Sequence, residues 1–368
     1  MPRTKVVEFI TNMGDGGAET LVKDYMLLLD REKIEVCAVI CFDDADSANL
    51  RRLRERNISV ISLDPGRNLF YRVWRKLNQP HYYGHRFLHL VKKQNITVVH
   101  AHLEVLDFLA QVSQGLKGIR LFHTCHAPAE KIYRGKEKTA AEKLIRENHM
   151  GLIALHEDMA RELNELFSVT DTAVIRNGID LGRFADPGVT RAEKRKELAI
   201  PADAFVLGHV GRFAEVKNHD FLAEVFREVA LRRGNAFLLM VGTGDPSAIE
   251  EKLKNYGLGD RYRILSGRTD INEILTAMDA FAFPSHHEGL GIALVEAQAA
   301  GLRCVASTGV PEEAFRTELC FRLPPQDPAR WAELLLSHEK HPAAKDLSVY
   351  DMNREIKRLE ELYLGVKS

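Results

Sequence analysis

The sequence has almost no excess charge of either sign, no long apolar run and no C-x-x-C cysteine pair. Its 368 residues include 51 Lys and Arg against 52 Asp and Glu, a formal net charge of −1. Proteins that bind nucleic acid through its phosphates usually show a strong basic excess, so this balance disfavours a nucleic-acid partner. A content of 45% hydrophobic and 28% charged residues is typical of a globular chain, and the length suits two domains.

The apolar runs are too short for a membrane span, which needs about 20 consecutive residues. Near the N-terminus a short apolar run is interrupted by Glu8, which disfavours a secretory signal and predicts a cytoplasmic protein. The five cysteines are odd in number and form no C-x-x-C pair. We therefore expect reduced, mostly buried thiols.

Short strand-like runs alternate with helical patterns along the whole chain. The candidate strands are 6–10, 35–41, 60–63, 98–100, 121–123, 152–154, 173–175, 205–210, 236–241, 263–265, 280–283, 303–306 and 320–323. Helical patterns include 18–29, 48–56, 103–114, 219–231, 292–300 and 350–364. This alternation predicts an α/β fold of parallel sheets covered by helices on both faces.

A segment rich in Gly and Asp interrupts the alternation near the midpoint. Residues 177–188 contain three Gly, two Asp and one Pro, which is typical of a linker. We expect two doubly wound, Rossmann-like domains facing a cleft, over residues 1–178 and 189–347, with a C-terminal helix at about 348–366 able to pack back on the first. Such open sheets bind ligands at the carboxyl ends of their strands.

A glycine turn follows the first candidate strand. The run Gly14-Asp15-Gly16-Gly17-Ala18-Glu19 opens a helical pattern but lacks the third glycine of the dinucleotide fingerprint, which disfavours a nicotinamide dehydrogenase. Backbone N–H groups at such a turn can still approach an anion. A plain strand-to-helix turn is the commoner interpretation.

Two cations follow the first strand of the second half. Arg212 comes directly after Gly211, and Lys217 stands at the mouth of the next helical pattern. A cation at a helix N-terminus opposes the helix dipole, and an anion held by both side chains would remove that conflict. The Arg fork and the Lys point charge suit a diphosphate, although a solvated surface pair explains the same residues equally well.

The segment 283–301 combines a strand end, a glycine-containing loop and an apolar helix. Glu296 is the sole charged residue between Gly289 and Leu302, so we expect a buried carboxylate that needs a partner. A salt bridge to another helix would satisfy Glu296, as would two ribose hydroxyls of a ligand. The N–H groups of residues 290–292 lie at the helix mouth, where they can hold a phosphate.

These residues resemble the retaining glycosyltransferases of family 4, particularly the exopolysaccharide and capsule enzymes. The resemblance rests on Glu288 and Glu296 inside a Pro-Ser-x-x-Glu-Gly-x-Gly frame, with Gly211-Arg212 and Lys217 upstream. It extends through Gly16-Gly17-Ala18-Glu19, Val99-His100-Ala101-His102, the loop ending at His126, and Asn177-Gly178-Ile179-Asp180.

The resemblance implies the two-domain GT-B fold and a hexosyltransferase that retains anomeric configuration, needs no metal or other cofactor, and acts by same-face attack. The donor is a nucleoside diphosphate sugar, and the acceptor is a glycan or lipid-linked hydroxyl. Implied catalytic residues are His126, Glu288, Arg212 and Lys217. Implied donor-binding residues are Gly16, Gly17, Arg212, Lys217, Glu288, Gly289, Leu290, Gly291, Ile292 and Glu296. Leu290 departs from many members, which carry Phe there.

Other functions remain as alternatives. Asp44-x-Asp46 resembles a metal-diphosphate signature, but Asp46 or Ser47 as the cap of helix 48–56 is the favoured interpretation. His100, His102, His123 and His126 could hold zinc in a metal-dependent hydrolase, although no suitable carboxylate stands out, and we expect His100 and His123 to point across the sheet from their neighbours. A nucleotide-sugar epimerase of the same fold, or a catalytically silent nucleotide-sugar binder, is also open.

A basic and aromatic segment lies at residues 65–93, with seven basic and no acidic residues. Such a segment suits peripheral contact with the anionic inner face of a membrane. An ordinary positive domain face is the simpler alternative. His81, His85 and His89 recur every four residues, which predicts one helix face rather than a metal site.

Overall fold

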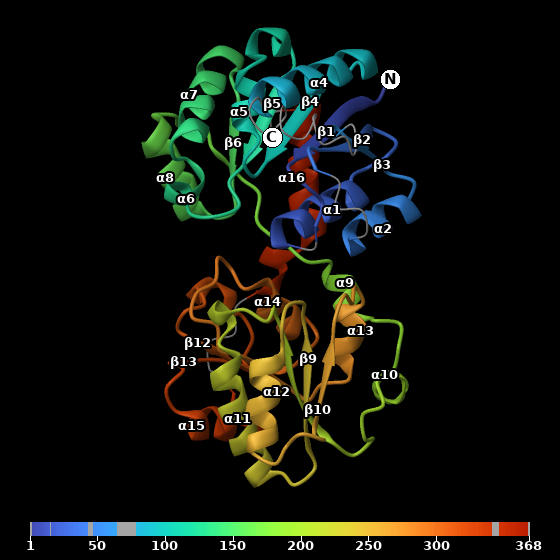
Figure 1. Ribbon diagram of the computed structural model, residues 1–368, viewed down its shortest axis with the longest axis vertical. Coiled ribbons are helices and arrows are strands. Elements are labelled where there is room, and N and C mark those ends of the chain that lie inside the picture. The colour runs from blue at the N-terminus through green and yellow to red at the C-terminus, as the bar shows by residue number, and fades with distance from the viewer. Residues whose placement is uncertain (1, 15, 43–46, 65–78, 341–345, 367–368) are drawn as a thin grey trace. The chain divides into compact units, whose positions relative to one another are not determined.

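The computed structural model describes residues 2–14, 16–42, 47–64, 79–340 and 346–366. The chain divides into two compact units, Met1–Asn177 together with Asn353–Ser368, and Gly178–Met352. We call them the N-terminal and the C-terminal domain. Each contains one sheet flanked by helices (Figure 1).

The N-terminal domain is built on a parallel sheet with the strand order β3-β2-β1-β4-β5-β6-β7. Its strands are β1 (Thr4–Ile10), β2 (Ile34–Ile40), β3 (Ser59–Ser62), β4 (Val98–His102), β5 (Arg120–Thr124), β6 (Gly151–Ala154) and β7 (Ala173–Val174). The chain moves outward from β1 to β3 and then returns to place β4 on the other side of β1. The strand order therefore reverses between β1 and β4.

Helices cover both faces of this sheet. They are α1 (Gly17–Leu28), α2 (Ala48–Glu55), α4 (Gln79–Gln94), α5 (Leu106–Ala110), η1 (Ser113–Leu116), α6 (Ala129–Ile132), α7 (Lys136–Asn148) and α8 (Glu157–Phe167). The C-terminal helix α16 (Met352–Leu364) also packs here, among elements from the beginning of the chain (Figure 1). Its Tyr363 is fully buried and donates a hydrogen bond to Glu8 of β1.

The C-terminal domain repeats the plan with the parallel order β10-β9-β8-β11-β12-β13. Its strands are β8 (Phe205–Val210), β9 (Ala236–Val241), β10 (Tyr262–Leu265), β11 (Ala280–Phe283), β12 (Arg303–Ser307) and β13 (Cys320–Leu323). Its helices are α9 (Leu181–Ala185), α10 (Arg191–Glu197), η2 (Glu215–Lys217), α11 (His219–Arg232), α12 (Ser247–Asn255), α13 (Ile271–Thr276), α14 (Ile292–Ala299), η3 (Glu312–Ala314), α15 (Pro328–Leu336) and η4 (Leu347–Tyr350). Here the strand order reverses between β8 and β11.

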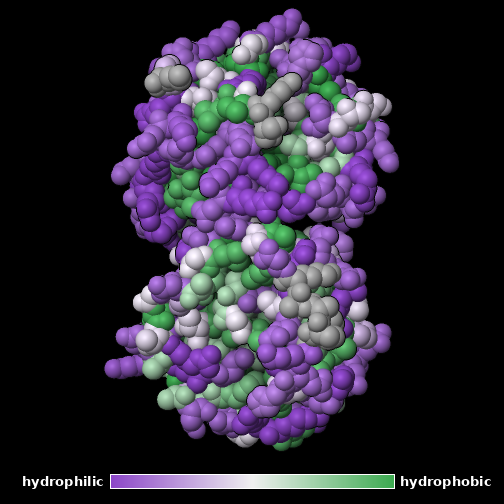
Figure 2. Space-filling model, turned by 180° about the vertical axis from the view of Figure 1, so that it is seen from behind, coloured by the Kyte–Doolittle hydropathy of each residue, from purple (hydrophilic) through white to green (hydrophobic). Residues whose placement is uncertain are grey.

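Apolar strands sandwiched between helices form the cores of both domains. Strands β9 and β11 are buried at every residue, as expected of parallel strands covered on both faces. On the face shown in Figure 2 most of the surface is hydrophilic, and apolar side chains lie in separate patches. All five cysteines are buried and unpaired, which confirms the expected free thiols.

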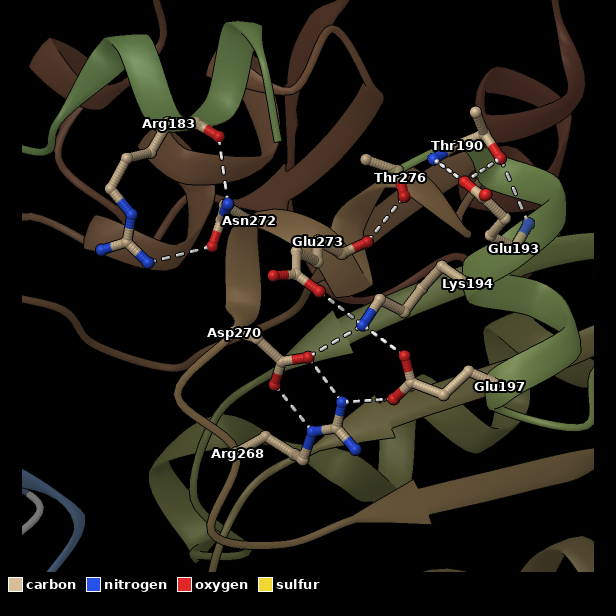
Figure 3. Close-up of polar contacts among 10 residues, drawn as sticks. All are labelled: Arg183, Thr190, Glu193, Lys194, Glu197, Arg268, Asp270, Asn272, Glu273 and Thr276. Carbon is tan, nitrogen blue, oxygen red and sulfur yellow. Dashed lines mark hydrogen bonds and ion pairs between the residues drawn. The ribbon is translucent and has the colours of Figure 1, made fainter. Parts of the chain in front are cut away.

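A buried lysine fastens α10 to the loop that precedes α13. Lys194 is 2% exposed, and its Nζ lies 2.6 Å from Glu197, 3.0 Å from Asp270 and 2.7 Å from Glu273 (Figure 3). Arg268 bridges two of the same carboxylates, Glu197 and Asp270, at 2.7 and 2.5 Å. Because a buried charge requires partners, this network fixes the segment that enters the C-terminal domain.

Each of the thirteen predicted strands overlaps an observed one. The prediction of one helix over 103–114 was wrong, because Leu103 adopts a left-handed conformation with φ 58° and the segment divides into α5 and η1. The 177–188 segment, predicted as a linker, contains the short helix α9. Within the described residues, no helix combines the length and apolar character needed to cross a bilayer.

Candidate active site

The carboxyl ends of β8 and β11 lie side by side at the reversal of the C-terminal sheet. The two strands pair directly, with Leu207 opposite Ala280. In an open parallel sheet, the loops that leave such a reversal diverge to opposite faces and leave room for a ligand. The two loops that follow these strands carry most of the residues singled out in the sequence.

The loop after β8 is closely packed at its glycines. A Cβ on Gly242 would lie 2.0 Å from the carbonyl oxygen of Gly211, so the loops after β8 and β9 can approach only because Gly242 has no side chain. Arg212 follows at once and is exposed. Among the described residues its guanidinium has no hydrogen bond or ion pair. Arg212 therefore presents its full charge at this end of the sheet.

Lys217 and Glu288 form an ion pair between the two loops. Lys217 Nζ lies 2.5 Å from Glu288 Oε1, and the side chains are 17% and 13% exposed. The ammonium also lies 5.0 Å from the ring centroid of Phe283, the last residue of β11. The structure thus unites the two predicted residues from segments 71 positions apart, and Glu288 offsets the charge of Lys217 beside the helix start.

The loop that carries Glu288 is held by its backbone. His286 N–H donates to Val216 O at 2.8 Å, and Glu288 N–H donates to Gly309 O at 3.1 Å. A Cβ on Gly309 would meet His286 O at 2.1 Å, so only glycine permits this approach. These contacts fix the Glu288 carboxylate against Lys217.

Helix α14 begins at the end of the same loop. Gly291 caps it in a left-handed conformation with φ 83°, which suits glycine. The N–H groups of residues 290–292 make no hydrogen bond within the described chain. They are therefore available to an anion, with the helix dipole adding partial positive charge. Gly289 is exposed and Leu290 is partly exposed.

Glu296 lies on α14, four residues beyond its first residue. The expectation that this carboxylate is buried was wrong, since Glu296 has intermediate exposure. The side chain of the neighbouring Gln298 is the buried polar group of this helix, and it bonds to the backbone of Leu294, Ala314, Arg316 and Thr317.

A second polar cluster lies at the reversal of the N-terminal sheet, between β1 and β4. His126, just after β5, shares a 2.9 Å hydrogen bond between its Nε2 and His102 Nδ1. His102 Nε2 in turn lies 2.7 Å from Glu8 Oε2. Gly16 and Gly17 also follow β1, Gly16 as the cap and Gly17 as the first residue of α1. Glu8 is the functional candidate that we missed, and a lone charge inside an apolar strand was the available signal.

The four histidines of the hydrolase alternative do not converge on one point. His123 lies on the opposite face of the sheet, where it bonds to Tyr133 and to the carbonyl of Leu103. His100 lies beside His102, contrary to expectation, because residues two apart on a strand share a face. The statement that no carboxylate is suitably placed was also wrong. Glu8, His100 and His102 approach one another closely enough for a metal, but hydrogen bonds already occupy their ring nitrogens.

Burial governs protonation throughout this cluster. It raises the pKa of Glu8 from 4.5 to about 8, against a smaller opposing effect of the Tyr363 hydrogen bond. It lowers the pKa values of His102 and His123 to about 3, and that of His126 well below 6.5. At neutral pH, Glu8 is therefore mainly protonated and the imidazoles are uncharged.

Two sequence features lie partly or wholly outside the described residues. Asp44-x-Asp46 falls there, and the cap of α2 is Ser47, whose side chain accepts a hydrogen bond from Leu50 N–H. Of the basic segment 65–93, residues 65–78 fall outside. In the remainder, His81, His85 and His89 are all exposed along α4, as predicted for one helix face.

Known proteins resemble the chain along nearly its full length. The family model described as Glycosyltransferase Family 4 matches residues 15–183, and that of Glycosyl transferases group 1 matches residues 190–350. The glycosyltransferase EpsF of Bacillus subtilis is 29% identical over 90% of this chain and 86% of its own. The capsular polysaccharide biosynthesis glycosyltransferase CapH of Staphylococcus aureus is 26% identical over 98% and 99%.

Two further comparisons bear on ligands and fold. The Escherichia coli UDP-Gal:alpha-D-GlcNAc-diphosphoundecaprenol alpha-1,3-galactosyltransferase is 32% identical over 59% of each chain. HepE of Anabaena, solved in complex with UDP and glucose, aligns with a TM-score of 0.74 at 17% identity over 99% of this chain and 100% of that one, which shows a shared fold. With two Rossmann-like domains and both halves matched, the chain belongs to the family 4 glycosyltransferases of the GT-B fold.

Proposed function

We propose that the chain transfers a hexose from a nucleoside diphosphate donor to a hydroxyl of a glycan or lipid-linked acceptor, with retention of configuration and without a metal ion. The observation that carries this proposal is the Lys217–Glu288 pair beside the open N-terminus of α14. Arg212, which has no ion pair with any residue that the structure describes, adds a further positive charge at the same sheet end. UDP is the favoured nucleotide, since the Escherichia coli relative is named for UDP-Gal and HepE was solved in complex with UDP and glucose.

In this proposal, Arg212, Lys217 and the N–H groups of residues 290–292 hold the diphosphate. Charge builds up on the diphosphate as its bond to the sugar breaks, so fixed positive groups stabilise the transition state more than the ground state. This supplies, from the protein, the stabilisation that a metal ion gives elsewhere. In same-face attack, the leaving phosphate oxygen takes the proton of the acceptor hydroxyl.

The ion pair does not have to break when the donor binds. An ammonium has three N–H groups, so Lys217 can keep Glu288 while it donates to a phosphate oxygen. Glu288 retains free lone pairs that can accept from hydroxyls of the transferred sugar, and Glu296 can accept from the ribose. The pair thereby couples the position of the sugar to that of the diphosphate.

The N-terminal domain is proposed to serve the acceptor and the reaction centre. The family resemblance assigns His126 to the reaction centre, and Gly16 and Gly17 to the binding of the donor.

Peripheral contact with an anionic membrane is proposed for α4, whose Arg86, Lys92 and Lys93 are exposed. Sedimentation with vesicles of anionic or zwitterionic lipid tests this contact, and equal binding to both would contradict it.

A thermal-shift screen of nucleoside diphosphates, with and without a chelator, tests the donor site. UDP should raise the melting temperature and EDTA should leave that rise unchanged, whereas no shift with any nucleotide would contradict the assignment.

Turnover with donor and acceptor tests the transfer itself. Glu288→Ala should abolish UDP release with the fold intact, and the anomeric configuration of the product, determined by NMR, should match that of the donor. Conversion of the donor without an acceptor would indicate an epimerase instead, and UDP binding without turnover would indicate a binding protein.

A further inference from the structure

A continuous chain of hydrogen bonds runs from a buried carboxyl to His126. Glu8 Oε2 lies 2.7 Å from His102 Nε2, and His102 Nδ1 lies 2.9 Å from His126 Nε2. Glu8 and His102 are completely buried, whereas His126 is partly exposed. Its second ring nitrogen, Nδ1, has no hydrogen-bond partner within the described part of the chain. The series of hydrogen bonds therefore ends at His126 Nδ1, an atom that is available to a substrate.

We propose that Glu8 and His102 are positioning residues that set the tautomer of His126, so that His126 Nδ1 donates a hydrogen bond when Glu8 is protonated and accepts one when Glu8 is ionised. This inference rests on the proposed function, since it assumes that His126 lies at the reaction centre.

The tautomers follow from having one hydrogen in each hydrogen bond. Protonated at Oε2, Glu8 donates to His102 Nε2, so the proton of neutral His102 is on Nδ1. His102 Nδ1–H then donates to His126 Nε2, which leaves the proton of neutral His126 on Nδ1. In this state His126 offers an N–H to a sugar hydroxyl or phosphate oxygen.

Loss of one proton from these three side chains reverses the direction of both hydrogen bonds that join them. Ionised Glu8 accepts from His102 Nε2–H, His102 Nδ1 accepts from His126 Nε2–H, and His126 Nδ1 carries a lone pair. The first state holds three exchangeable protons on these groups and the second holds two. Both imidazoles stay neutral, so a proton taken up at His126 Nδ1 neutralises Glu8 without creating a buried cation.

Tyr363 of α16 determines which carboxyl oxygen carries the proton. Its hydroxyl donates to Glu8 Oε1 at 2.8 Å and lies 2.5 Å from His100 Nδ1, from which it must accept. His100 Nε2 then accepts from the Thr124 hydroxyl at 2.7 Å. Because Oε1 is already occupied as an acceptor, the Glu8 proton belongs on Oε2, facing His102.

The groups around Glu8 favour the protonated state at neutral pH. They are His100 and His102 on β4, His126 after β5, Tyr363 on α16, Tyr25 on α1 and Cys37 on β2. Burial lowers the histidine pKa values and raises those of the tyrosines and Cys37, so all of these neighbours are uncharged near pH 7. No described cation stabilises the Glu8 carboxylate, whose pKa burial raises to about 8.

Nitrogen-15 NMR of histidine-labelled protein tests the tautomer without turnover, with His126→Gln identifying the signals of that ring. At pH 6.5 to 7 we expect His126 Nδ1 to be protonated and Nε2 to be unprotonated, and the assignment should exchange as the pH passes about 8. Protonated Nε2 at pH 7, or no exchange up to pH 9.5, would overturn the proposal.

Glu8→Gln provides the kinetic test, because the amide donates to His102 and accepts from Tyr363 as the protonated acid does. In the Nδ1–H state His126 can donate to a sugar hydroxyl or phosphate oxygen, so we expect turnover to follow the protonated fraction of Glu8. With a pKa of about 8, the ratio of kcat at pH 9 to kcat at pH 7 should therefore be about tenfold higher in Glu8→Gln than in wild type. Tyr133→Phe is the matched control, since it removes the partner of His123 on the other sheet face. An equal pH profile in wild type and Glu8→Gln would refute the relay.

Nucleotide binding separates this proposal from the proposed function. The donor residues of the C-terminal domain do not belong to the hydrogen-bond chain, so UDP should raise the melting temperature of Glu8→Gln as much as that of wild type. Loss of UDP binding in wild type itself would refute the proposed function and leave the tautomer result standing on its own.

Discussion

Replacement of Lys217 by methionine isolates the charge that the donor site depends on. Methionine keeps a flexible apolar stem against Phe283 but cannot donate to Glu288 or to a phosphate. A hydrogen bond to a charged group contributes about 2–3 kcal/mol when it is shielded from water, and Lys217 is only 17% exposed. We therefore expect Kd for UDP, measured by calorimetry, to rise about 30- to 150-fold.

Lys252→Met is the matched control for this substitution. Lys252 also pairs with carboxylates, Asp220 at 2.8 Å and Glu224 at 2.9 Å, but it connects α12 to α11 rather than the loops at the strand ends. Its loss should leave UDP affinity within about twofold of wild type. The reasoning is refuted if folded Lys217→Met binds UDP as tightly as wild type, or if both variants lose affinity equally.

Three further substitutions test the supporting structure. Gly309→Ala should displace the loop at His286 and weaken UDP binding at least about tenfold, whereas Gly234→Ala, where an added Cβ meets no atom within 4 Å, should not change it, as calorimetry would show. Lys194→Met should lower the free energy of unfolding by about 1–3 kcal/mol in urea titrations, because Arg268 retains two of the three carboxylates. Glu8→Gln should melt above wild type at pH 9 and at the same temperature as wild type at pH 4. The raised pKa of Glu8 means that wild type loses stability as the pH rises from 4.5 through about 8, whereas the amide does not titrate. A difference in melting temperature that is the same at pH 4 and pH 9 would contradict this pKa.

The strands were predictable because parallel strands buried on both faces are continuous apolar runs, and β9 is apolar at every residue. The position of the site residues near the two points of strand-order reversal could also be predicted, since the strands end at turns that the sequence identifies. The pairing of Lys217 with Glu288 was not, because it depends on backbone contacts such as that of His286 with Val216, between loops far apart in sequence.

Glu8 and Glu296 are each the lone carboxylate of an apolar segment. A lone carboxylate in an apolar segment was treated as a functional signal at Glu296, yet at Glu8 it was used only to disfavour a secretory signal. The structure reverses the two environments, with Glu8 fully buried and Glu296 half-buried. A strand with both faces covered buries every side chain, whereas a helix of eight residues leaves one side accessible at its ends.

A crystal structure of the full chain with UDP, grown without divalent metal, tests the central claim most directly. Our account predicts phosphate oxygens within hydrogen-bond distance of Lys217 Nζ and of the N–H groups at the start of α14, with Glu288 still paired to Lys217. A diphosphate bound away from the carboxyl ends of β8 and β11 would contradict it.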